Sequence, residues 1–125
     1  MKVTGRIADG VGDFRVRMTR YPDVFERATG ERLFPGTLNV DIGTPLPVRE
    51  DFRIRGADID EPGQDLLFER CLVAGRRAYR IRPYQLRGGG GGHGDHMLEI
   101  ASVHELRPLL VGNENAVEVE FFRDD

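Results

Sequence analysis

The sequence predicts a small, mainly β barrel of six or seven strands with two short helices. Three observations support this fold class: short stretches of alternating apolar and polar residues recur, turn-forming residues separate them, and there is no internal repeat. Of the 125 residues, 39% are hydrophobic and 31% charged, as in ordinary globular proteins. We expect a single domain over residues 1–125, large enough to bury its own core.

The predicted strands are short, and turn signals bound most of them. The longest pair is a hairpin within LLFERCLVAGRRAYRIRPYQL, which we expect to turn near Ala74 and Gly75. In its second arm, Tyr79 and Ile81 share one face. The other predicted strands are KVTGRIA (2–8), FRVRM (14–18), TLNVDI (37–42), FRI (52–54), MLEIA (97–101) and AVEVEFF (116–122).

Two segments predict helices. YPDVFERATG (21–30) has a proline at the first helical position and a glycine after the last turn. SVHE (102–105) fits a capping box in which Ser102 is the N-cap. This second helix must be short, because Pro108 would interrupt its hydrogen bonds.

RGGGGGHGDH (87–96) is the one low-complexity stretch. Five consecutive glycines do not hold a packed element, because ordering them costs much conformational entropy. The stretch is either a flexible linker between strands or a mobile loop over a site.

Charge and cysteine content restrict the partners. A formal net charge of −3 argues against a general nucleic-acid binder. Cys71 is the only cysteine, so an internal disulfide is excluded and a reducing compartment is expected. No signal-like segment or membrane-length apolar run occurs, so we expect a soluble, cytoplasmic protein that does not use a membrane.

The strand after the Pro-Gly turn carries a polar face. Side chains alternate along a strand, so Thr37, Asn39 and Asp41 project to the same side. Thr37 and Asn39 offer neutral oxygens of the type that Mg²⁺ accepts when phosphates and water complete its shell. The alternative is a half-buried strand with an ordinary polar outer face. Asp41 is either a solvated aspartate, an outer-sphere metal contact or a proton acceptor.

Two backbone features could bind phosphate. Successive amides in the glycine loop DGVGDF (9–14) could form an anion-binding nest, although a simple hairpin turn also explains this loop. The helix after Ser102 begins with unpaired amides, and Arg107 could add a contact, although every helix has such an end.

Other chemical signatures are weak. No cysteine pair or third ligand accompanies His93 and His96, so a structural zinc site is not expected. Ser102 is the only serine and lacks the context of a nucleophile elbow. Cys71 lies in an apolar strand, which predicts a core position.

Three motifs follow one another along the chain. A glycine loop comes after the first strand, then YPDVFERATGERLFPGTLNV, and LEIASVHELRPLL precedes the last strand. In this order they resemble the archaeal CTP-dependent riboflavin kinase family, from residue 5 to residue 122, with GTLN the most specific part. The resemblance implies a cradle-loop β-barrel that transfers the γ-phosphoryl group of CTP to riboflavin, giving FMN.

The resemblance also implies roles for individual residues. Thr37 and Asn39 match the family's Mg²⁺ ligands, and Gly91, His93 and Glu99 match positions that contact the flavin. The sequence departs from the family's pattern at three places. No third glycine follows the glycine loop, Gly91 stands where the family has a threonine, and Glu105 stands where it has a basic residue. The nucleotide-contacting segments match Gly10, Val11, Gly12, Asp13, Phe14 and Arg15, and also His104, Glu105, Leu106 and Arg107.

We therefore expect a Mg²⁺-dependent kinase whose partners are the small molecules riboflavin and CTP, and whose expected form is a monomer. The substitutions at Gly91 and Glu105 leave open a non-catalytic module that binds a flavin or a nucleotide on the same barrel. A third alternative is a small barrel that binds DNA or assists assembly, which the acidic balance disfavours.

Overall fold

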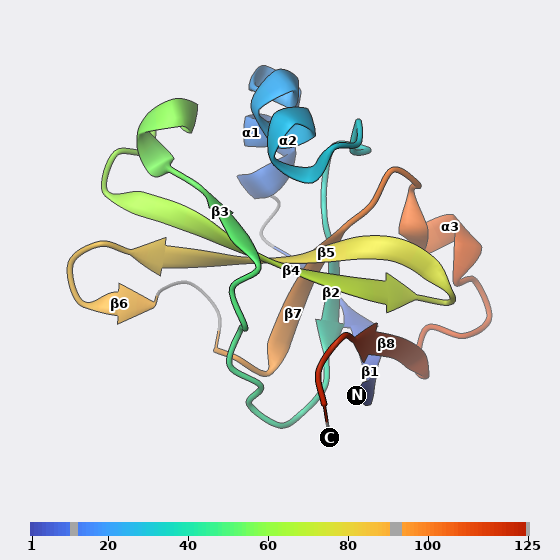
Figure 1. Ribbon diagram of the computed structural model, residues 1–125. Coiled ribbons are helices and arrows are strands. Elements are labelled where there is room, and N and C mark those ends of the chain that lie inside the picture. Colours follow the sequence, from blue (N-terminus) through green and yellow to red (C-terminus); the bar gives the residue numbers. More distant parts are fainter. Residues whose placement is uncertain (11–12, 91–93, 125) are drawn as a thin grey trace.

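The computed structural model describes residues 1–10, 13–90 and 94–124. Its longer strands are β1 (Lys2–Ala8), β2 (Leu38–Asp41), β4 (Gln64–Val73), β5 (Arg76–Gln85), β7 (Met97–Ala101) and β8 (Val117–Phe121). Within the described ranges these six strands pair antiparallel in the order β4–β8–β1–β2–β7–β5, and β5 pairs again with β4 (Figure 1). They close a barrel, which confirms the predicted mainly β fold.

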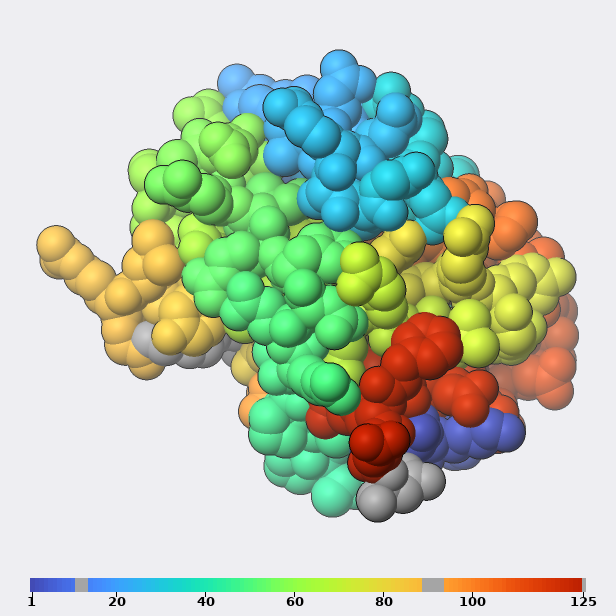
Figure 2. All heavy atoms as spheres, in the orientation of Figure 1, coloured from blue at the N-terminus to red at the C-terminus, as the bar shows by residue number. Residues whose placement is uncertain are grey.

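Two shorter strands lie outside the closed ring. β3 (Phe52–Ile54) pairs with β4, which confirms the predicted strand at this position. β6 (Gly89–Gly90) pairs with the end of β5, so part of the glycine-rich stretch takes part in the sheet. Figure 2 shows the chain after β5, in gold, standing out from the body of the molecule.

Alternating apolar side chains fill the barrel. Val40 on β2 and Leu98 and Ile100 on β7 are completely buried, and Cys71 on β4 joins the same core, as predicted. Burying each large aliphatic side chain contributes about 1.5–3 kcal/mol. Because this core fixes which face of each strand points inward, it also directs Asn39, between two core residues of β2, to the outside of the barrel.

The β4–β5 hairpin turns at Ala74 and Gly75, as predicted. Both residues have positive φ, 50° and 76°, as a two-residue type I′ turn requires. Tyr79 and Ile81 on β5 both belong to a second core cluster, which confirms their common face. Its other members are Phe14, Met18, Phe25, Leu33, Ile54, Ile59, Leu66, Phe68 and Ala101.

The predicted strand at residues 14–18 is wrong, because this segment belongs to the helix α1 (Asp13–Arg20). Phe14 and Met18 are 5% and 2% exposed, whereas Val16 between them is 68% exposed. Residues four apart share a helix face, so the burial follows the helical period. Five residues with alternating apolar character fit both periods, and packing against the second core cluster decides for the helix.

The predicted helix at residues 21–30 is confirmed as α2 (Pro22–Thr29), which ends at Gly30 in the left-handed conformation. Figure 1 shows α1 and α2 packed together at one end of the molecule. The described residues also contain the single-turn helix α3 (Leu106–Leu109), close to the second predicted helix, and the 3₁₀ turn η1 (Gly56–Ile59). With α1, which was not predicted, these ranges hold three short α-helices instead of two. None of the helices in these ranges is long and apolar enough to span a membrane.

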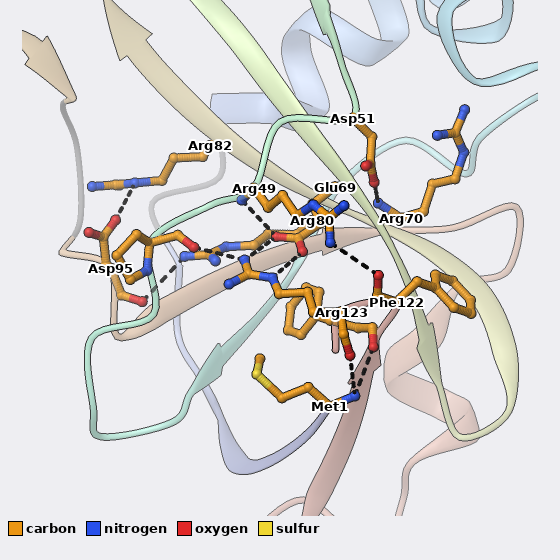
Figure 3. Close-up of polar contacts among 12 residues, drawn as sticks. Met1, Arg49, Asp51, Glu69, Arg70, Arg80, Arg82, Asp95, Phe122 and Arg123 are labelled. Atoms are coloured by element: carbon orange, nitrogen blue, oxygen red, sulfur yellow. Dashed lines mark hydrogen bonds and ion pairs between the residues drawn. The ribbon is translucent and has the colours of Figure 1, made fainter. Parts of the chain in front are cut away.

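A buried ion pair joins the hairpin to the C-terminal segment (Figure 3). Glu69 on β4 is 2% exposed and accepts two hydrogen bonds of 2.6 Å from the guanidinium of Arg123. Arg80 on β5 is completely buried, and this burial lowers its pKa to about 10 although the carboxylate of Glu69 opposes the shift. The N-terminal amine of Met1 donates to the Phe121 carbonyl oxygen at 3.0 Å, so Met1 is joined to the end of β8.

Candidate active site

A cavity of about 320 Å³ lies outside the barrel wall and draws on three distant segments. Its walls come from Gly10 and Arg15, from residues 34–39, and from the segment 100–107. The structure therefore brings together one described end of the glycine loop, the strand after the Pro-Gly turn, and the segment that follows β7. The candidate residues in its wall are Gly10, Arg15, Thr37, Asn39, His104, Glu105, Leu106 and Arg107.

The Pro-Gly turn that leads into β2 is held from two sides. Gly36 has a φ of 117°, which L-residues with a side chain rarely adopt, and its amide donates to the Met18 sulfur of α1 at 3.3 Å. The amide of Phe34 donates to the carbonyl oxygen of Ser102 at 2.8 Å. Because both bonds flank the turn, Thr37 enters β2 from a fixed position.

Asn39 is the most constrained polar residue of the cavity. It is 7% exposed and pairs in register with Ala8 on β1 and Glu99 on β7. A Cβ atom on Gly10 would lie 1.7 Å from Asn39 Nδ2, so only glycine lets the chain approach so closely. Asn39 Oδ1 is buried and accepts no hydrogen bond within the described part of the chain. A buried oxygen that accepts no hydrogen bond and lies at a cavity wall is suited to bind a cation or to accept a hydrogen bond from a ligand.

The cavity also has positive charge. The described residues of its wall include the guanidinium groups of Arg15 and Arg107 and one carboxylate, that of Glu105. Since α1 begins at Asp13, the first amides of this helix have no intrahelical partner and carry a partial positive charge. These groups favour an anionic ligand, of which phosphate is the most common example at helix starts.

The described residues contain no group of three or more His, Cys, Asp or Glu side chains that could hold a metal ion. A metal in this cavity would therefore rely on neutral oxygens, such as Thr37 Oγ1 and Asn39 Oδ1, and on oxygens that an anionic ligand brings with it. Mg²⁺ is commonly coordinated in this way, because it keeps few protein ligands and completes its octahedron with phosphates and water.

The chain is similar to a riboflavin kinase. That protein, from Staphylothermus marinus, is 29% identical over 120 residues, which cover 94% of this chain and 88% of the relative. No family model matches the sequence. The similarity spans all three segments that line the cavity.

The capping box predicted at Ser102 is wrong. Helix α3 begins only at Leu106, after Glu105, which makes no side-chain capping bond. Instead, the Ser102 hydroxyl donates to the Arg77 carbonyl oxygen of the hairpin at 3.0 Å and accepts from the His104 amide at 3.2 Å. Ser102 is 2% exposed at the end of β7, and a buried hydroxyl needs a hydrogen-bond partner. It therefore bonds to the backbone of the neighbouring strand instead of capping a helix. The His104 amide is therefore engaged and is not one of the unpaired amides expected after Ser102. His104 and Arg107 both line the cavity.

Three predicted residues do not line the cavity. The Phe14 side chain is buried in the core beneath α1. Asp41 lies at the far end of β2, where its Oδ1 accepts from the Gly43 amide at 2.9 Å and stabilises the following turn. Glu99 is half-buried on β7 beside Asn39, outside the cavity wall. Val11, Gly12, Gly91 and His93, as well as the side chain of Asp13, lie outside the described residues.

Sequence reasoning missed Phe34 and Pro35 as wall residues. In the sequence, Leu33 and Phe34 are adjacent apolar residues, and no periodic pattern tells which one is buried. The structure buries Leu33 to 7% exposure and leaves Phe34 at 42%. A phenyl ring directly before a Pro-Gly turn was the available signal, because turns lie at the surface.

A second cavity, of about 560 Å³, lies between the end of α2 and the hairpin. Tyr79 donates to Glu31 Oε2 at 2.6 Å, and Arg77 pairs with Glu31 Oε1 at 2.6 Å. Burial, and next the hydrogen bond to Glu31, raise the pKa of Tyr79 to about 12. These polar groups satisfy one another, so we assign no ligand to this cavity.

Proposed function

We propose that this protein is a riboflavin kinase that transfers the γ-phosphoryl group of a nucleoside triphosphate, CTP by its resemblance, to riboflavin with Mg²⁺ as cofactor. One observation carries the proposal: Thr37 and Asn39 meet Gly10, Arg15 and the segment 104–107 around one cavity. The similarity to the Staphylothermus marinus riboflavin kinase supports the same reaction.

The residues present fit a magnesium ion. Thr37 Oγ1 and the buried Asn39 Oδ1 would hold it, and the triphosphate would supply the anionic oxygens that these neutral ligands lack. When bound, the ion neutralises charge on the β- and γ-phosphates. Arg15, Arg107 and the first amides of α1 would hold the remaining phosphate oxygens.

The reaction forms a bond between a ribityl hydroxyl oxygen of riboflavin and the γ-phosphorus, and breaks the bond from that phosphorus to the β–γ bridging oxygen. The nucleoside diphosphate leaves, and the hydroxyl proton is lost. Such transfers need positioning and charge neutralisation more than covalent help from the protein. Asp41 lies outside the cavity wall and holds the Gly43 amide, so we assign it no role as base.

The flavin would lie beside the nucleotide, over Glu99. This residue is the direct cross-strand neighbour of Asn39, and their side chains leave the sheet on the same face. A flavin held there would present its ribityl chain toward the metal ligands. The resemblance adds Gly91 and His93, which lie outside the described residues, as further flavin contacts.

One observation favours a second function. Glu105 contributes a carboxylate to the cavity wall, and a carboxylate repels phosphate. This supports the alternative of a binding module that keeps the barrel and binds a flavin or nucleotide without turnover.

Incubation with riboflavin, Mg²⁺ and each of CTP, ATP, GTP and UTP, followed by chromatography for FMN, separates the two. We expect FMN in a Mg²⁺-dependent reaction that is fastest with CTP. Flavin or nucleotide binding without FMN would establish the module instead, and absence of both would remove both functions.

A further inference from the structure

Phe34 is exposed where large apolar side chains are usually buried. It is 42% exposed, while the preceding Leu33 is 7% exposed in the second core cluster. Among the described residues that line the cavity, Phe34 carries the one phenyl ring. Its neighbours in the wall are mostly polar groups and backbone, so the ring gains nothing there from packing in a core.

The backbone that carries this ring is fixed. The Phe34 amide bonds to the Ser102 carbonyl oxygen at 2.8 Å, and two residues later the Gly36 amide bonds to the Met18 sulfur at 3.3 Å. Between them, Pro35 has its φ locked by its ring. A flat side chain on a rigid segment loses little conformational entropy when a planar ligand stacks on it.

The position of the ring relative to the metal ligands indicates what it would stack on. Phe34 precedes Thr37 by three residues, so their Cα atoms are at most about 11 Å apart. A nucleoside triphosphate with its β- and γ-phosphates at Thr37 and Asn39 extends away from them through its α-phosphate and ribose to its base. Phe34 lines the same cavity as Thr37 and Asn39 and is within reach of that base, whereas Glu99, the expected flavin contact, lies outside the wall.

We propose that Phe34 is the platform on which the base of the nucleotide stacks. The inference rests on the proposed function, because it takes the bound ligand to be a nucleoside triphosphate. Every base has a π-face, so stacking contributes affinity without selecting one base. Selection among bases would then come from the groups around the ring, and Phe34 itself would set how tightly any nucleotide is held.

The first test compares two ligands that differ only in the nucleoside. Calorimetry would measure the Kd of Mg²⁺-CTP and of Mg²⁺-tripolyphosphate, which has no base, for the natural protein and for Phe34→Leu. Leucine keeps apolar bulk but removes the ring, so we expect the Kd for CTP to rise about 5- to 100-fold and that for tripolyphosphate to stay unchanged. Phe122→Leu is the matched control, since Phe122 is 61% exposed and lies outside this cavity.

A second variant uses the absence of tryptophan from the chain. Phe34→Trp introduces a single tryptophan, which can be excited apart from the three tyrosines and whose emission we expect CTP to quench to saturation and tripolyphosphate to leave unchanged. Phe122→Trp should respond to neither ligand. Riboflavin is omitted from these titrations and then tested separately, by its own fluorescence, against Phe34→Leu.

Three results would overturn the inference: a Kd for CTP that is the same in Phe34→Leu as in the natural protein, equal weakening of CTP and tripolyphosphate, or a loss confined to riboflavin binding. The last would assign the ring to the flavin. None of these three results contradicts the proposed kinase reaction. A natural protein that binds no nucleotide would overturn the proposed function together with this inference, so the two failures are distinguishable.

Discussion

Replacing Gly10 with alanine tests the geometry of the proposed metal site from outside it. A Cβ at this position would lie 1.7 Å from Asn39 Nδ2 and 2.8 Å from Asn39 Cγ, whereas ordinary contacts begin at 3.4 Å. The loop or the amide must therefore move by about 1.7 Å, because Asn39 is held between β1 and β7 and is 7% exposed. A displacement of about 1 Å in a catalytic constellation costs about 100-fold in rate.

We therefore expect kcat/KM for FMN formation in Gly10→Ala to fall at least about 100-fold. Gly10 itself is exposed, so the loss of stability should stay within about 1–3 kcal/mol. Steady-state kinetics over a range of Mg²⁺ concentrations, together with thermal unfolding, would measure both quantities.

Gly63→Ala is the matched control. A Cβ at Gly63 meets no heavy atom within 4 Å, so its kinetics should equal those of the natural protein. If Gly10→Ala keeps the natural kcat/KM and the natural Mg²⁺ dependence, the close approach to Asn39 does not position a metal ligand and the reasoning fails.

Three other perturbations give separate outcomes. The double variant Thr37→Ala/Asn39→Ala should abolish Mg²⁺-dependent FMN formation, seen by chromatography, while the barrel remains folded by circular dichroism. Arg123→Ala removes both guanidinium hydrogen bonds to the buried carboxylate of Glu69, which keeps the Arg49 amide and the charge of Arg80, so urea unfolding should show a loss of about 3 kcal/mol. Burial, and next the charge of Glu69, raise the pKa of Cys71 from 9.0 to about 12. Since the unfolded thiol ionises first, the free energy of unfolding should fall as pH rises from about 9 to 12, and Cys71→Val should reduce this slope.

Each of these predictions has a control that should respond little. Thr44→Ala/Asn115→Ala alters exposed residues of the same types and should keep its turnover. Arg32→Ala breaks two exposed ion pairs, with Asp23 and Glu26, each of which is worth at most about 1 kcal/mol. Turnover in the Thr37/Asn39 double variant, equal stability losses for the two arginine variants, or an unchanged alkaline slope in Cys71→Val would contradict the respective prediction.

The sequence predicted the elements well where the signal is local. The hairpin at Ala74 and Gly75 and the end of α2 at Gly30 follow from residues whose backbone conformations leave few alternatives. Residues 14–18 were assigned wrongly for the opposite reason. Five alternating residues fit both a strand and a helix, and only the burial of Phe14 and Met18 on one side selects the helix.

The residues of the candidate site likewise fall into those that a local pattern predicts and those that depend on contacts between distant segments. Thr37 and Asn39 were recognised as neutral oxygen donors from strand alternation, since that pattern is local. The role of Ser102 was misjudged, because its hydroxyl bonds to the Arg77 carbonyl oxygen on another strand. Phe34 was missed, because adjacent apolar residues do not reveal which one the fold leaves exposed.

By itself, the sequence determined most of the strands, the hairpin turn and the chemical character of the donor residues, because alternation and backbone preference act over a few neighbouring positions. Only the tertiary structure decided that Gly10, Asn39 and Arg107 surround one cavity. That meeting depends on β1, β2 and β7 pairing side by side. Such pairing is set by burial of a shared core between residues far apart in the chain, which no short window of sequence contains.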